Sequence, residues 1–289
     1  MKISNKAKHR PRVIRTLPGL RAAIAQMRKR DRTIALVPTM GALHEGHFSL
    51  VRRAQSRADC VIVSIFVNPT QFAPHEDLTT YPRTFAADVA ALAERQAALI
   101  WAPSVATMYP EGFATRVVPN GPATVGLEDL SRPHFFAGVA TVVAKLLIQC
   151  QPDIALFGEK DYQQLKVVAQ LVRDLGLNTR IIGVPIVREG DGLALSSRNR
   201  YLTAAEREIA PAVYRALKQA AAQIRAGTAL TEVLAKARGT VTQAGLQVDY
   251  FEARNAETLL PLKASPGEPI RLLAAARIGT TRLIDNIAV

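Results

Sequence analysis

The sequence predicts an α/β protein: a parallel sheet with helices on both faces, followed by a smaller α+β domain. Three observations predict this class. Short apolar runs alternate with longer helical patterns over about two thirds of the 289 residues, the texture changes near residue 190, and 48% of residues are hydrophobic. Strands that alternate with helices are typical of parallel sheets covered on both faces.

The first domain is expected over residues 1–187. The basic stretch 1–15 is interpreted as a ragged arm that precedes the fold. Apolar runs predict strands, and amphipathic or long apolar patterns predict helices. The expected strands span 33–39, 60–69, 98–104, 153–161 and 179–189, and the expected helices span 47–58, 85–97, 138–150 and 163–176.

The second domain is expected over residues 188–289. A long helical pattern spans 203–227, and Thr203 followed by Glu206 forms a capping box at its start. A second helix is expected over 229–245. The segments 247–256 and 270–289 have the composition of strands.

Charge and cysteine content narrow the class of function. The formal charge is +13, but the basic residues are dispersed and aromatic residues are only 6%, so a nucleic-acid stacking surface is not favoured. A basic enzyme that handles anions fits better. Cys60 and Cys150 lie in apolar runs without a CxxC motif, and no apolar run reaches membrane-span length. These features predict a cytoplasmic protein that binds neither nucleic acid nor membrane.

The segment "PTMGALHEGHFSL" (38–50) places His44 and His47 three residues apart beside glycines. A metal site, a phosphate site and an ordinary loop are all compatible with two such histidines. Zincin histidines lie four apart on a formed helix, and no third ligand is evident. The phosphate interpretation fits best, because a turn at Gly41 before a helix would present free backbone N–H groups and a helix dipole.

Three further turns carry polar residues. Lys160, Asp161 and Gln164 follow a predicted strand in "FGEKDYQQL", where a surface lysine and a simple helix cap are the alternatives. Ser196, Ser197 and Arg198 in "GLALSSRNRYL" suit a segment that closes on phosphates, although the same letters also occur in ordinary loops. Gln71 in "VNPTQF" could orient a small substrate, or simply follow a turn begun by Asn68-Pro69.

Taken together, these segments resemble the pantothenate synthetase (pantoate–β-alanine ligase) family. The resemblance rests on "PTMGALHEGHFSLV", "VSIFVNPTQF", "EDLTTYPRT", "FGEKDYQQL" and "REGDGLALSSRNRYL" in that order. "HEGH" is similar to the HIGH signature of the nucleotidylyltransferase superfamily. The resemblance implies a Rossmann-like first domain, a C-terminal lid domain and a homodimer. It also implies that (R)-pantoate attacks Mg-ATP to give pantoyl adenylate and diphosphate, and that β-alanine then displaces AMP.

The resemblance implies roles for individual residues. His44, His47, Lys160 and Arg198 would be catalytic, and His47 would donate a proton. Gln71 would bind pantoate and β-alanine, and Gln164 would bind pantoate. No protein ligand is expected for the metal, which would be Mg²⁺ carried by ATP. The residues implied in ATP binding are Met40, Gly41, Ala42, Leu43, His44, Glu45, Gly46, His47, Gly158, Glu159, Lys160, Asp161, Val187, Leu195, Ser196, Ser197 and Arg198.

Two departures from the family pattern stand out. Leu195 replaces a frequent methionine, a change of similar size that is expected to be harmless. In "RPHFFAGV" (132–139), histidine occupies position 134 and Phe135 takes the usual histidine place. His134 is therefore left out of the predicted site.

Two other functions compete with the ligase hypothesis. A cytidylyl- or adenylyltransferase would keep the nucleotide in its product, but Gln71 and Gln164 suit a small hydroxy acid better than a phosphate ester. The second rival is a nucleic-acid-binding protein. One version of it, a tRNA synthetase, is not favoured, because a synthetase of this length would lack an anticodon-binding domain.

Overall fold

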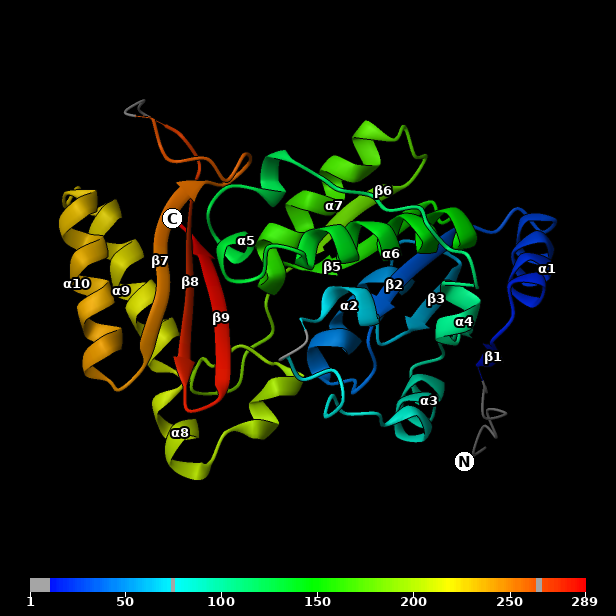
Figure 1. The fold of residues 1–289 in the computed structure, drawn as a ribbon, viewed down its shortest axis with the longest axis horizontal. Helices are drawn as coiled ribbons and strands as arrows, with labels where there is room; N and C mark the ends of the chain where they lie inside the picture. The colour runs from blue at the N-terminus through cyan, green and yellow to red at the C-terminus, as the bar shows by residue number, and fades with distance from the viewer. Residues whose placement is uncertain (1–10, 74–75, 264–266) are drawn as a thin grey trace, which may run out of the picture. The chain divides into compact units, whose positions relative to one another are not determined.

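A six-stranded parallel sheet forms the centre of the amino-terminal part of the chain (Figure 1). The computed structural model describes residues 11–73, 76–263 and 267–289. The strand order is β1-β4-β3-β2-β5-β6, so the order reverses beside β2. The strands are β1 (Arg12–Ile14), β2 (Ile34–Thr39), β3 (Cys60–Ile65), β4 (Leu99–Trp101), β5 (Ile154–Gly158) and β6 (Arg180–Val184). The predicted parallel sheet is confirmed.

Helices cover both faces of this sheet. The side chains of the central strand β2 are apolar on both faces from Ile34 to Pro38, so each face needs a covering layer. Ala35 and Val37 pack with helix α2 (Glu45–Gln55), and α3 (Phe85–Glu94) adds Leu92 to the same cluster. Helices α1 (Leu17–Arg28) and α6 (Phe135–Cys150) contact each other, and α6 contacts β2. Helix α4 (Val105–Met108) is a single turn, and α7 (Tyr162–Asp174) joins β5 to β6.

The amino-terminal end of the described chain differs from the expectation. Residues 12–14 are not part of a ragged arm but form strand β1, which pairs with β4 through Arg12↔Leu99 and Ile14↔Trp101. Ile14 is buried, and this burial explains why the strand is ordered against the sheet. The rest of the predicted arm, residues 1–10, lies outside the described residues. Helix α1 was also missed, although Thr16 caps it and Pro18 stands in its first turn.

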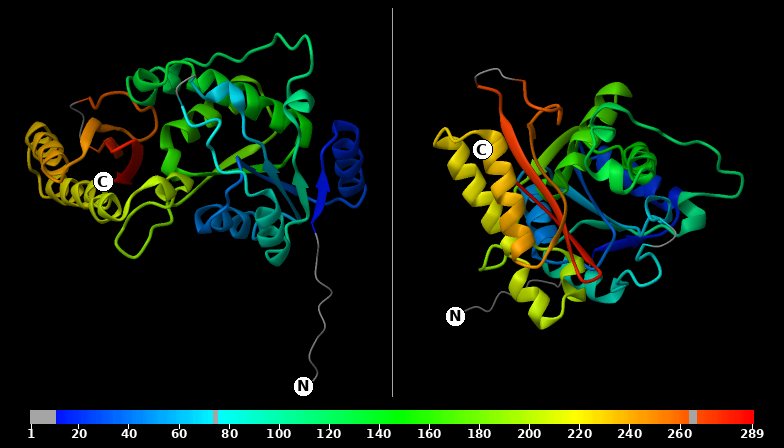
Figure 2. Two further views of the ribbon diagram at one scale, coloured as in Figure 1. Left: turned by 60° about the horizontal axis from the view of Figure 1, so that its bottom comes forward. Right: turned by 60° about the vertical axis from the view of Figure 1, so that its left-hand side comes forward.

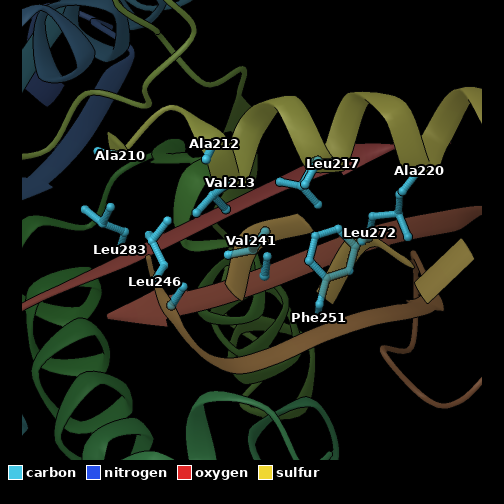
Figure 3. Packing of buried hydrophobic residues seen from close by; sticks show 14 of the residues in the cluster. Ala210, Ala212, Val213, Leu217, Ala220, Val241, Leu246, Phe251, Leu272 and Leu283 are labelled. Atoms are coloured by element: carbon cyan, nitrogen blue, oxygen red, sulfur yellow. The ribbon is translucent and has the colours of Figure 1, made fainter. Parts of the chain in front are cut away.

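A three-stranded antiparallel sheet, β7-β8-β9, forms the centre of the carboxy-terminal part. Its strands are β7 (Gln247–Asn255), β8 (Ile270–Ile278) and β9 (Thr281–Ala288), and helices α9 (Ala212–Arg225) and α10 (Leu230–Gln243) lie along it (Figure 2). Figure 3 shows Leu217 and Ala220 of α9 turned toward Phe251 and Leu272 of the strands. This apolar layer is the core that holds the smaller sheet to its helices.

The single long helix expected over 203–227 is wrong, because the chain forms two helices there. The predicted capping box is present, with Thr203 and Glu206 at the start of α8 (Ala204–Ile209). Pro211 then separates α8 from α9. Proline has no N–H to donate to the preceding turn, and its ring clashes with the carbonyl four residues earlier, so it ends the first helix.

Two compact units divide the chain. Among the described residues, the first contains those of 11–119, 132–158 and 167–184, and the second contains those of 120–131, 159–166 and 185–289. The second unit therefore includes α5 (Glu128–Ser131) and the short 3₁₀ turns η2 (Gly121–Ala123), η3 (Glu159–Asp161) and η4 (Ser197–Tyr201). The domain boundary expected between residues 187 and 188 stays a prediction.

Two other expectations concern membranes and thiols. None of the helices in the described ranges has both the length and the apolar composition that a membrane span needs. Cys60 and Cys150 are free thiols. Burial raises the pKa of Cys150 to about 12, so this side chain acts as a small core residue.

Candidate active site

The turn after β2 is held by a carboxylate from helix α3. Asp88 accepts hydrogen bonds from the backbone N–H groups of Ala42 (3.0 Å) and Leu43 (2.9 Å), and it is 3% exposed. Gly41 N–H donates to Thr39 Oγ1, and Gly41 has φ +80°, a left-handed conformation that favours glycine. The expectation that this turn presents free N–H groups to a phosphate is therefore wrong for residues 41–43, because the protein itself uses them.

His44 and His47 begin helix α2 as a reciprocal pair. Nδ1 of His44 accepts the N–H of Gly46 at 3.1 Å, and Nδ1 of His47 accepts the N–H of His44 at 3.3 Å. Their ring centroids are 4.2 Å apart. Since both Nδ1 atoms accept, the proton of each neutral ring is on Nε2. Both imidazoles are thus oriented as Nε2–H donors at the positive end of a helix dipole.

The turn after β3 holds Gln71 in one orientation. Residues Pro69–Gln71 form the 3₁₀ turn η1, and the Asn68 side chain caps it, as the Asn68-Pro69 alternative predicted. Asn68 Nδ2 also donates to Gln71 Oε1 at 3.0 Å. The Gln71 amide nitrogen contacts the Met40 sulfur at 3.3 Å, so the turn after β2 and the turn after β3 meet in the first unit.

Asn68 is itself oriented by buried neighbours. It is 1% exposed, its Nδ2 donates to Gly138 O, and Tyr109 donates its hydroxyl to Asn68 Oδ1 at 2.8 Å. Burial raises the pKa of Tyr109, which keeps its hydroxyl protonated. Asn68 and Asp88 were both missed from sequence, where only the Asn-Pro pair was a signal and it indicated a turn.

Arg132 also contacts the turn η1. Its guanidinium forms two hydrogen bonds to the Glu76 carboxylate (2.6 and 2.7 Å) and one to the Gln71 carbonyl (3.1 Å). Phe135, at the position where the family pattern has histidine, lies under Arg132 with 3.8 Å from the guanidinium carbon to the ring centroid. His134 is exposed at the start of α6 and makes no side-chain cap bond. The departure thus replaces a polar residue with a buried stacking ring.

In the second unit, the turn that follows Gly158 carries the predicted Lys160 and Asp161. Both side chains are partly exposed. Lys160 and Ser196 line one small cavity of about 20 Å³, together with Asn199 and Arg282. A cavity of this size has room for about one water molecule. Residues 159–161 and 195–198, from two of the predicted phosphate segments, therefore lie side by side in this unit.

The segment 187–198 is internally braced. Leu195 N–H donates to the Val187 carbonyl at 3.0 Å. Ser196 caps η4 by accepting the N–H of Arg198 at 3.3 Å. Gly192, with φ +95°, lies so close to Tyr214 that an added Cβ would be 2.2 Å from that ring. The loop is thus built to a defined shape rather than being an arbitrary surface connection.

Comparison with known proteins decides the family. The profile described as pantoate–β-alanine ligase matches residues 12–288. Pantothenate synthetases of Nitrobacter hamburgensis and Rhodopseudomonas palustris are 61% and 60% identical over 279 residues, which is 96% of this chain and 99% of each relative. This chain belongs to the pantoate–β-alanine ligase family.

Solved structures agree with this ligase family. The crystal structure of pantothenate synthetase from Thermus thermophilus superposes with a TM-score of 0.90 at 46% identity, over 96% of this chain and 98% of that one. The ligase from Francisella tularensis, in complex with an ATP compound and β-alanine, gives 0.81 at 38% identity, over 96% and 97%. The predicted resemblance is confirmed. The chain is a ligase, and its family's reaction is ATP-dependent condensation of (R)-pantoate with β-alanine through pantoyl adenylate, with release of AMP and diphosphate.

The ligase has two adjacent glutamines at the start of α7, and the structure separates their roles. Gln163 is 3% exposed, and its amide is engaged by Glu128 N–H, the Pro122 carbonyl and Asp129. Gln164 is partly exposed. Gln163 therefore anchors the 120–131 segment, and Gln164 is the glutamine of the pair that remains accessible to a small molecule.

Proposed function

We propose that this ligase forms pantoyl adenylate with His44 and His47 as paired hydrogen-bond donors to the phosphates of ATP. The observation that carries the proposal is the reciprocal His44–His47 arrangement, with both Nδ1 atoms accepting backbone N–H groups. A neutral imidazole that holds its proton on Nε2 is a good donor but a very weak acid. His47 would then stabilise developing charge rather than transfer a proton.

We propose that the other predicted residues also bind ATP. Lys160 and Arg198 would neutralise phosphate charge, Asp161 would accept from the ribose, and Val187 would meet adenine through its backbone. The resemblance supports these roles, and the shared cavity of Lys160 and Ser196 supports the pairing of the two segments. The remaining ATP contacts would come from 40–47, 158–159 and 195–197.

We propose that Gln71 and Gln164 bind pantoate, and that Gln71 also meets β-alanine. Asn68 engages Gln71 Oε1, and one N–H of the Gln71 amide faces the Met40 sulfur, so the second N–H is the donor that would meet a carboxylate or hydroxyl oxygen. In the first step a pantoate carboxylate oxygen bonds to the α-phosphorus while the bond to diphosphate breaks. In the second step the β-alanine amine, having lost a proton, bonds to the acyl carbon and AMP leaves.

We propose that Mg²⁺ enters as part of the substrate Mg-ATP. Among the described residues, no three His, Cys, Asp or Glu side chains form a group that could hold a metal ion. Phosphate oxygens and water are the ligands that Mg²⁺ commonly keeps with nucleotides. When Mg²⁺ is titrated at fixed ATP, the rate of pantothenate formation should follow the concentration of the Mg-ATP complex.

We propose a cytoplasmic homodimer, as the resemblance implies. Light scattering should then give twice the chain mass of 31.3 kDa. A mass equal to that of one chain would contradict the dimer.

A product assay tests the reaction. AMP and diphosphate should appear in equal amounts, and pantothenate should form only when ATP, pantoate and β-alanine are all present. A product that retains the nucleotide after β-alanine is added would favour the rival nucleotidyltransferase function.

Replacing His47 by alanine tests the site. We expect His47→Ala to lower the rate of adenylate formation roughly 10²- to 10³-fold, the usual effect of losing a transition-state donor. His134→Ala is the matched control, because this histidine is exposed and outside the proposed site. Near-normal single-turnover rates for His47→Ala would remove the proposed phosphate role.

A further inference from the structure

The last strand of the chain holds the backbone of the turn that contains Lys160. Asn286 of β9 donates from its side-chain nitrogen to the carbonyl oxygens of Glu159 and Lys160, both at 2.9 Å. Asn286 is 2% exposed. All three residues belong to the second unit. The two donors of this amide are therefore both spent, in a buried setting, on consecutive carbonyls of one turn.

Arg271 of β8 sets the orientation of that amide. Its Nε donates to Asn286 Oδ1 at 2.7 Å, which requires the amide nitrogen to face the turn. A terminal nitrogen of Arg271 lies 3.1 Å from the Glu159 carboxylate, and the guanidinium carbon lies 4.0 Å from the centroid of the Tyr162 ring. Arg271 is 8% exposed, so this arrangement is shielded from water. Strands β8 and β9 thus contact the turn at Glu159, Lys160 and Tyr162.

The backbone of a lysine matters because its side chain is long and flexible. A four-carbon stem with rotatable bonds can place its ammonium group over a wide volume. The carbonyl groups of Glu159 and Lys160 flank the Lys160 Cα along the backbone. Fixing both of them restricts the direction in which the Lys160 side chain leaves the turn. Restriction of this kind lowers the entropy cost of bringing a cation to a reacting phosphate.

We propose that Asn286 is a positioning residue that acts through Lys160 in the use of ATP. Arg271 supports it by fixing the amide orientation. The inference rests on the proposed phosphate role of Lys160. Asn286 lies more than a hundred residues from Lys160 along the chain and has no proposed contact with substrate.

A double-mutant cycle tests this coupling. The variants Asn286→Ala, Lys160→Ala and the double variant are compared by kcat and KM for Mg-ATP and for pantoate. We expect Asn286→Ala to lower kcat/KM for Mg-ATP roughly 10-fold, as for the loss of two hydrogen bonds, with KM for pantoate changed by less than about 2-fold. In the Lys160→Ala background, Asn286→Ala should lower kcat/KM for Mg-ATP by less than about 2-fold, because the effects of coupled residues are not additive.

Asn255→Ala is the matched control. Asn255 ends β7 of the same sheet and also holds a turn, by accepting the N–H groups of Glu257 (2.9 Å) and Thr258 (3.1 Å). Asn255→Ala should leave kcat/KM for Mg-ATP within about 2-fold of the parent, because the N–H groups that Asn255 accepts belong to a different turn from the one that carries Lys160. An equal loss from Asn286→Ala in both Lys160 backgrounds, or the same loss from Asn255→Ala, would overturn the inference.

Two measurements keep the outcomes separate. If Lys160→Ala alone leaves the kinetics for Mg-ATP unchanged, the proposed role of Lys160 fails and the inference fails with it. If Asn286→Ala does not fold, as judged by circular dichroism, Arg271→Lys replaces it, because this variant keeps the charge and loses the Nε donor. An unchanged kcat/KM for Mg-ATP in folded Arg271→Lys would count against the inference.

Discussion

At the scale of single residues, Asp88 explains the shape of the turn after β2. Ala42 has φ +49°, an uncommon conformation for a residue with a side chain. Two hydrogen bonds from consecutive N–H groups to one buried carboxylate offset this local cost. Asp88 therefore holds in place the backbone from which His44 and His47 extend.

Asp88→Asn tests this role. An asparagine has one acceptor oxygen, so one of the two backbone N–H groups would face an amide nitrogen that also donates. We expect a loss of about 1–3 kcal/mol in the free energy of unfolding, together with a higher KM for Mg-ATP. Urea unfolding and steady-state kinetics measure both.

Glu94→Gln is the control for Asp88→Asn, because Glu94 lies at the end of the same helix and its side chain is 78% exposed. Its unfolding free energy should stay within about 0.5 kcal/mol of the parent. Equal effects from the two variants would contradict the role given to Asp88.

At the scale of elements, the contact between α6 and η1 depends on Gly138. A Cβ added at Gly138 would lie 2.4 Å from the Thr70 carbonyl oxygen and 2.8 Å from the Gln71 nitrogen. Both atoms are backbone, so neither can rotate away. The glycine thus lets a helix lie directly against the turn that carries a proposed substrate-binding side chain.

Gly138→Ala should displace this turn. We expect a loss of about 1–3 kcal/mol in the free energy of unfolding from overpacking. KM for pantoate should rise more than KM for Mg-ATP, because Gln71 moves with the turn. Kinetics with each substrate varied in turn would detect the difference, and equal increases in both KM values would contradict it.

Gly239→Ala is the control with the opposite expected sign. Gly239 lies inside helix α10, and an added Cβ there meets no atom within 4 Å. Alanine should raise the free energy of unfolding by about 0.5–1 kcal/mol without changing either KM.

At the scale of the whole molecule, an ion pair in the first unit ties stability to pH. Burial raises the pKa of Asp153, but the hydrogen bonds from Arg28 (2.7 Å) and from the N–H of Ile34 (2.6 Å) outweigh it and leave the pKa below its ordinary value. A lowered folded-state pKa adds stability above the unfolded value, near about 3.9, and that stability is lost as pH falls through the folded value.

Asp153→Asn should therefore be less stable than the parent at pH 7, and the two should converge below about pH 4. The pair is partly exposed, so the difference at pH 7 should be only about 0.5–1 kcal/mol. Urea midpoints measured from pH 7 to pH 3 give the comparison. A constant difference over this range would show that the carboxylate charge is not responsible.

Much of the fold could be predicted because its signals are local. The run "IALVPT" is apolar on both faces, as a central parallel strand requires, and Thr203 with Glu206 marks the start of α8. The predicted helix over 203–227 failed at Pro211, a local signal that was present and outweighed by the helical pattern. Strand β1 is only three residues long, too short for any periodicity to identify.

The sequence by itself determined the alternation of strands and helices, the turns that carry the polar residues, and the resemblance to an adenylate-forming ligase. Only the tertiary structure decided which distant residues bond to the backbone of those turns or pack against it. Asp88 takes the N–H groups of Ala42 and Leu43, Gly138 lets α6 reach η1, and Asn286 takes two carbonyls beside Lys160. Propensity and periodicity depend on neighbours along the chain. Hydrogen-bond partners and close packing depend on which distant segments approach within a few ångströms, and that is known only once the chain has folded.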